Sequence, residues 1–145
     1  MTTLRIEPIL PKGKTFPLPK RDVVLADLRT FGGRTINRMA KYPPQQPTVS
    51  GYERSGSLGR NWKQKTGSTG GGSRNSSIYV EVYNAVNRNG RAYAGYVQGF
   101  ASSFPKGQRQ TAEMARRGWQ RLDYVAEEEW DRILPTLRAH LTEVD

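Results

Sequence analysis

The residues best placed to do chemistry near the N-terminus are a glycine, a lysine and a threonine. Gly13-Lys14-Thr15 resembles the end of a phosphate-binding loop. That motif needs a strand before it and a glycine five positions before Gly13, where this chain has Pro8. The glycine-rich run from Gly67 to Ser73 lacks the lysine and the strand-to-helix setting that aim backbone N–H groups at phosphates. We therefore expect no phosphate-binding loop.

The other candidates for acid–base chemistry lie near the C-terminus. A histidine-based triad needs a base, an orienting acid and a nucleophile held together, but His140 is the only histidine and falls on a predicted surface helix, so we expect it to be solvated. Glu127 to Glu129 with Asp131 could supply a carboxylate pair, yet we expect a solvated, partly salt-bridged face, because Glu128 and Arg132 are one helical turn apart. The chain has no cysteine. We therefore predict no catalytic residue, no metal site, no cofactor and no enzymatic activity.

Size and composition indicate one small, polar domain. The chain has 145 residues, which fits one hydrophobic core, and its mean hydropathy is -0.74. No stretch approaches the ~18 apolar residues that a membrane helix needs. Met1 to Leu10 lacks a basic start followed by an apolar run, so we expect no signal peptide and no membrane partner.

The charge is strong and unevenly placed. The formal net charge is +10, and the excess of Lys and Arg over Asp and Glu lies entirely in residues 1–75. This half should meet something acidic, either nucleic acid or an acidic protein surface. The candidate interaction surface consists of basic residues of the N-terminal segment and the first helix: Lys12, Lys14, Lys20, Arg21, Arg29, Arg34 and Arg38.

Two helices and an extended segment are expected to position these groups. Residues 1–20 contain four prolines, which favour an extended N-terminal arm that orders on a neighbouring subunit. Apolar residues at steps of three and four predict a helix from Asp22 to Lys41, with its arginines off the apolar stripe. The same spacing predicts a second helix from Arg121 to Leu141, which Pro135 should kink or end early.

The middle of the chain predicts a long hairpin. Ile78 to Asn84 alternates, with Ile78, Val80 and Val82 on one face and Tyr79, Glu81 and Tyr83 on the other. The glycine-rich segment from Gly67 to Ser77 should join this strand to one near Trp62 and, like the arm, order only on assembly. Ala92 to Gln98 fits a strand or a helix equally well. Trp62, Trp119 and Trp130 are expected to pack in the core.

The order of several short motifs carries a family resemblance. Arg54-Ser55-Gly56-Ser57-Leu58 leads to Trp62, a glycine-rich gap and a Val-rich strand ending in Asn84 follow, and then come Tyr93-Ala94-Gly95-Tyr96-Val97-Gln98-Gly99 and Gly118-Trp119. Over roughly residues 50–142 this order resembles the tail-completion or neck (head–tail joining) family of long-tailed bacteriophages, the family of lambda minor tail protein Z. The signature residues are Arg54, Ser55, Gly56, Leu58, Trp62, Asn84, Tyr93, Ala94, Tyr96, Val97, Gln98, Gly99 and Trp119.

The resemblance implies a structural virion protein. It implies an α+β subunit that forms a hexameric ring, joining the head connector to the tail around the double-stranded DNA passage. The partners would be a connector or stopper protein and a tail tube or tail terminator protein, in a particle made in the host bacterial cytoplasm. We expect a small antiparallel sheet with a long hairpin, packed against an N-terminal and a C-terminal helix. The domain would span residues 21–145, after the arm at 1–20. The alternative is a basic nucleic-acid-binding module.

Overall fold

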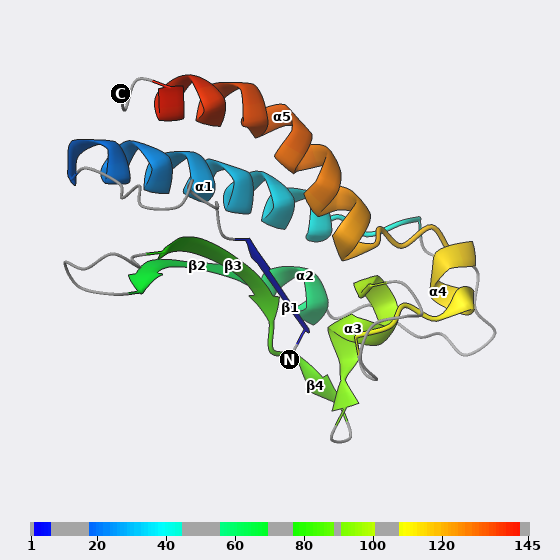
Figure 1. Ribbon diagram of the computed structural model, residues 1–145. Coiled ribbons are helices and arrows are strands. Elements are labelled where there is room, and N and C mark those ends of the chain that lie inside the picture. Colours follow the sequence, from blue (N-terminus) through cyan, green and yellow to red (C-terminus); the bar gives the residue numbers. More distant parts are fainter. Residues whose placement is uncertain are drawn as a thin grey trace.

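The computed structural model has an α+β fold in which two long helices cover one face of a three-stranded antiparallel sheet, as expected. It describes residues 2–6, 18–44, 56–69, 77–88, 91–100 and 108–142. The sheet contains β1 (Thr2–Ile6), β2 (Trp62–Thr69) and β3 (Ser77–Asn84) in the order β1-β3-β2. The long helices are α1 (Leu18–Met39) and α5 (Leu122–Thr142). Figure 1 shows both on the same side of the sheet, with α1 between α5 and the strands.

The predicted hairpin is present. β2 and β3 pair antiparallel from Trp62 opposite Asn84 to Thr69 opposite Ser77. Ile78, Val80 and Val82 are buried beneath the helices, whereas the alternate side chains of β3 are only half-buried. Residues 70–76, which hold most of the glycine-rich segment expected to order on assembly, lie outside the described residues.

The N-terminal segment corrects the expectation of an arm that makes few contacts with its own domain. Residues 2–6 are extended, but they form β1 and pair with β3 from Thr2 opposite Asn84 to Ile6 opposite Val80. Leu4 and Ile6 pack against buried side chains beneath the helices. This pairing joins residues almost eighty positions apart, so the local sequence could not reveal it. Residues 7–17, with Lys12 and Lys14, lie outside the described residues.

Helix α1 begins earlier than predicted, at Leu18, and includes Pro19 and Lys20. A proline is compatible with the first helical turn because its missing N–H would have no partner there. Gly32 allows α1 to approach the sheet closely, since a Cβ on it would lie 2.2 Å from Gln64 Oε1 and 3.2 Å from Val80 Cγ2. The glycine that weakens the helix locally thus lets α1 pack closely against Val80, while the exposed end of Gln64 lies over it.

Of the two expected effects of Pro135, a kink or an early end, the early end does not occur, because α5 continues to Thr142. Contacts with α1 occur on both sides of the proline. Ile133 and Leu137 are buried between the helices, and His140 reaches Asp27 of α1. Pro135 itself is exposed, so its ring meets no tertiary neighbour that would force the chain apart.

Replacing Pro135 with alanine should therefore stabilise the protein. Alanine restores the N–H that can bond to the carbonyl of Asp131 and removes the clash within the helix, effects partly offset by the greater freedom of the unfolded chain. We expect the free energy of unfolding to rise by about 1–2 kcal/mol. Urea denaturation followed by circular dichroism measures it. Unchanged or lower stability would show that α5 already accommodates the proline without strain.

Short elements complete the domain at one end of the long helices. They are α2 (Ser57–Arg60), the strand pair β4 (Asn87–Arg88) and β5 (Arg91–Ala92), α3 (Tyr93–Gln98) and α4 (Ala112–Arg116). Helix α3 settles the ambiguity between strand and helix, because Ala94, Val97 and Gln98 are buried on one helical face. None of the helices in the described ranges is long and apolar enough to cross a membrane.

Candidate functional site

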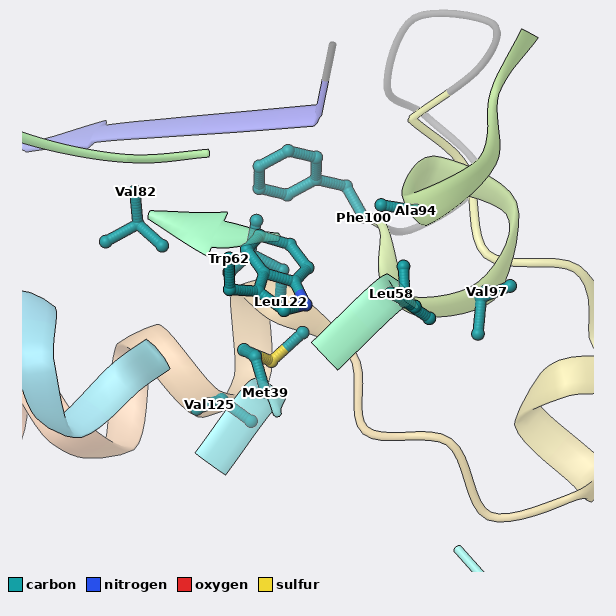
Figure 2. Close-up of a cluster of buried hydrophobic side chains, with 9 residues drawn as sticks. All are labelled: Met39, Leu58, Trp62, Val82, Ala94, Val97, Phe100, Leu122 and Val125. Atoms are coloured by element: carbon teal, nitrogen blue, oxygen red, sulfur yellow. The ribbon is translucent and has the colours of Figure 1, made fainter. Parts of the chain in front are cut away.

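The signature residues from separate parts of the sequence meet in one buried cluster. Figure 2 shows its nine side chains. They come from α1, α2, β2, β3, α3 and α5, and from Phe100, which lies two residues after the end of α3. Five residues of the signature or its flanks contribute apolar groups to it: Leu58, Trp62, Ala94, Val97 and Phe100. Tyr93 and Trp119 pack against its edge. The motifs identified in the sequence are therefore parts of one core.

Gln98 is the polar centre of this cluster. Its side chain is fully buried, its Oε1 accepts a hydrogen bond from Trp62 Nε1 at 3.1 Å, and its Nε2 donates to the carbonyl of Met39 at 2.9 Å. The two bonds join α3 to the start of β2 and to the end of α1. Because a buried amide without partners is costly, this position specifies how the three elements meet.

Asn84 has a similar role at the end of β3. Its Nδ2 donates to the carbonyl of Leu58 at 2.9 Å, and its Oδ1 accepts from the backbone N–H of Val86 at 3.0 Å. It is fully buried. One side chain thus ends the strand with a turn and fixes α2 against the sheet.

The remaining signature residues support the same region. Gly99 lies where two chain segments touch, because a Cβ there would be 1.9 Å from the carbonyl oxygen of Gln108. The carbonyl of Tyr96 accepts from Thr111 N at 3.0 Å, and the Trp119 ring lies 4.9 Å from that of Tyr42. Gly56 precedes α2 with a φ of 72°. Arg54 and Ser55 lie outside the described residues.

The structure describes the side chains of four of the seven residues in the predicted basic surface. Arg34 is exposed, Arg21 is half-buried, and Arg29 donates from Nε to Thr66 Oγ1 at 3.2 Å. The side chain of Lys20 is not among those described, and Lys12 and Lys14 lie in the undescribed segment.

Arg38 corrects the prediction of an exposed arginine on α1. It turns towards α5, where it forms ion pairs with Glu128 at 2.7 Å and with Glu129 at 3.1 Å. The hydrogen bond to Glu128 is the largest cause that raises the pKa of Arg38 above its ordinary value. The arginine therefore joins the two long helices, and 24% of its side chain stays exposed.

Glu129 departs from the predicted solvated, partly salt-bridged acidic face because it is buried. Its side chain is 2% exposed, and its Oε1 accepts from both Arg38 and Arg132. Arg132 pairs with Glu129 and not with Glu128, the partner that spacing suggested. The residues next to it, Glu127 and Glu128, are exposed. Burial at every third to fourth position of α5 accounts for the difference within the run.

His140 is half-buried and contacts a carboxylate, whereas the sequence predicted a solvated side chain. Its Nδ1 lies 2.6 Å from Asp27 Oδ2, and the Asp27 side chain is only 11% exposed. The pair joins the last turns of α5 to the first half of α1. Among the described residues, no group of three or more His, Cys, Asp or Glu side chains is arranged to hold a metal ion.

The outer face of the sheet is a surface that the sequence prediction missed. Tyr79, Glu81 and Tyr83 of β3 lie on this face, opposite the buried valines. Lys63 stands beside Tyr83 and Lys65 beside Glu81 on β2, and both lysines are exposed. The sequence does contain a signal for this surface, because Lys63 and Lys65 alternate with Trp62 and Gln64 along the strand.

One of the tyrosines on this face is already covered. The guanidinium carbon of Arg5 lies 3.9 Å from the centre of the Tyr79 ring, and Gly67 on the neighbouring strand leaves room for the hydroxyl end of Tyr79. Tyr83 has no such cover within the described ranges. We call Lys63, Lys65 and Tyr83 the outer sheet patch.

An apolar groove lies between β1 and the first half of α5. Its volume is about 600 Å³. The apolar lining comes from Leu4, Ile6, Phe100, Ala126 and Trp130. Glu127 also lines it, and Asp131 follows one helical turn later; both are exposed, and neither forms an ion pair within the described part of the chain. We call Glu127 and Asp131 the acidic helix patch.

Comparison with protein-family models, with curated proteins and with solved structures finds no match to this chain in any of the three.

Proposed function

We propose that the chain is a structural subunit of the neck or tail of a long-tailed bacteriophage, which works through contacts with other proteins and not by catalysis. Copies of it would form a closed ring, six-fold in the family it resembles, around the passage for double-stranded DNA. Its partners would be the head connector or stopper on one side and a tail tube or tail terminator protein on the other. It would be made in the host bacterial cytoplasm and reside in the virion.

One observation carries this proposal. The residues on which the resemblance rests come from three stretches of sequence, around Leu58, Asn84 and Gln98, and they contact one another in a single buried cluster. Asn84 bonds to the carbonyl of Leu58, and Gln98 bonds to the ring nitrogen of Trp62. These side-chain bonds between separated motifs are more specific than shared burial, because the apolar residues of a domain this small pack in the same core in any case. The bonds support reading these motifs as one inherited unit.

Electron microscopy of the purified chain without nucleic acid tests the proposal. We expect closed rings with one copy number at high protein concentration, and sedimentation equilibrium should give the matching mass. A chain that stays monomeric at every accessible concentration, or that forms only irregular aggregates, would contradict the ring.

The alternative, a nucleic-acid-binding module, is favoured by the aromatic and basic residues of the outer sheet face. Stacking on single strands uses the same residue types. Against it, Arg5 already covers the Tyr79 ring, and Glu81 places a carboxylate between the basic residues of the two neighbouring strands. We therefore expect random DNA to bind feebly at ~0.15 M salt. Tight, sequence-independent binding at that salt, with affinity falling steeply as salt rises, would instead support the alternative.

A further inference from the structure

We infer that copies of this chain contact one another head to tail, with the outer sheet patch of one copy docked on the acidic helix patch and the adjoining groove of the next. This inference rests on the proposed function, because it assigns the contact that would build the ring. The two surfaces belong to different elements of the same chain and carry opposite charge.

The outer sheet patch has the properties of a docking surface. Lys63 and Lys65 are exposed, and neither forms an ion pair within the described residues, although Lys65 stands opposite Glu81 in the sheet register. Both belong to β2, an edge strand of the three-stranded sheet. Tyr83 beside Lys63 adds a large side chain with a polar end, a type that is enriched in protein interfaces.

The second surface carries the opposite charge and adjoins an apolar groove. Glu127 and Asp131 present two carboxylates one turn apart on α5, and the groove beside Glu127 is lined mainly by apolar side chains. Trp130, half-buried in the groove wall, can pack against an aromatic ring from outside. A ring such as Tyr83 would enter the groove while its two neighbouring lysines meet the carboxylates.

A second copy fits this surface better than a nucleic acid does. The formal net charge of +10 makes general repulsion between copies strong, so close association requires local pairing of opposite charges. The two patches provide that pairing when they meet, whereas two copies of the same patch would repel each other. A contact between two different surfaces is heterologous, and repeated around an axis it closes a ring.

Charge reversal on one surface at a time tests the contact. The Lys63→Glu/Lys65→Glu variant and the Glu127→Lys/Asp131→Lys variant should each raise the dissociation constant for self-association at least about tenfold, measured by sedimentation equilibrium at ~0.15 M salt. The first variant lowers the net charge and so reduces general repulsion. Its weakened association would therefore report the lost contact and not the overall charge.

Mixing the two variants provides the sharper result. In an equimolar mixture, the acidic sheet patch of the first variant can dock on the basic helix patch of the second. The basic sheet patch of the second can dock on the acidic helix patch of the first. The mixture should therefore form assemblies with the molecular mass of the wild-type assembly. Such a ring alternates the two variants and closes only with an even copy number, six included. A single chain that carries all four substitutions keeps the original net charge and should also assemble.

The control is Lys41→Glu/Arg138→Glu, which lowers the net charge by the same amount as the lysine reversal, at two exposed positions outside both patches and outside the predicted basic surface. It should associate at least as well as the wild type. If the wild type forms rings and either reversal leaves them intact, the inferred contact is wrong while the proposed function stands. If the lysine reversal leaves assembly unchanged and weakens duplex binding, the outer sheet patch serves nucleic acid. A wild type that never assembles would overturn both.

Discussion

Replacing Arg38 with methionine is expected to lower the free energy of unfolding by about 3 kcal/mol. The substitution keeps the apolar stem but removes the charge that faces Glu129, whose side chain is 2% exposed. The carboxylate would keep only Arg132, which is 64% exposed and pairs with the same oxygen, Oε1. Glu129 Oε2 already lacks a hydrogen-bond partner within the described residues. A buried carboxylate left short of partners is strongly destabilising.

Two variants make this prediction specific. Arg34→Met, one turn earlier on α1 and exposed, should change stability by no more than about 0.5 kcal/mol. The double variant Arg38→Met/Glu129→Met removes both charges and should recover most of the loss, because a buried pair and an apolar pair of similar size are often close in stability. Urea unfolding of the three variants gives the comparison. Equal effects of the two single substitutions would mean that the buried pair contributes nothing.

The effect of pH on this ion pair follows from the direction of the shift. The pKa of Arg38 is raised in the folded chain, chiefly by its hydrogen bond to Glu128. A group with a raised pKa contributes its full stability below its unfolded pKa and loses it only as the pH rises through the folded value. Arg38 therefore keeps its positive charge from acid to strongly alkaline pH.

The sequence predicted those features of the fold that are encoded locally. Alternation from Ile78 to Asn84 predicted β3, and apolar spacing predicted both long helices, because periodicity follows from which face each element buries. The strand β1 was missed because its partner lies almost eighty residues away and because the prolines that follow it dominate its neighbourhood. Helix α3 stayed ambiguous because six residues are too few to separate the two periods.

Two ion pairs of the candidate site that the sequence did not predict depend on distant residues. Arg38 and Glu129 are 91 positions apart, and Asp27 and His140 are 113 apart. Charged residues in an amphipathic helix are usually solvated, so spacing within one helix favours pairs such as Glu128 with Arg132. Only the packing of α1 against α5 decides which of those charges turns inwards.

Replacing Gln98 with methionine should also lower the free energy of unfolding by about 3 kcal/mol. Methionine has a similar length and flexibility, so the volume of the core changes little. The substitution leaves two buried groups without their partner: the indole N–H of Trp62 and the carbonyl of Met39. Each unpaired buried group costs about 1–3 kcal/mol, and this desolvation term outweighs the gain from a more apolar side chain.

The control is Gln64→Met on β2. Gln64 is exposed, and its Nε2 donates to the carbonyl of Arg29 at 3.3 Å, so water can replace the lost bond. We expect a change of less than about 1 kcal/mol there. Urea unfolding followed by tryptophan fluorescence suits the comparison, because the ring of Trp62 is buried against Gln98 in the folded state. If Gln98→Met costs no more than Gln64→Met, the signature glutamine does not hold α1, β2 and α3 together. The resemblance would then lose its central structural support.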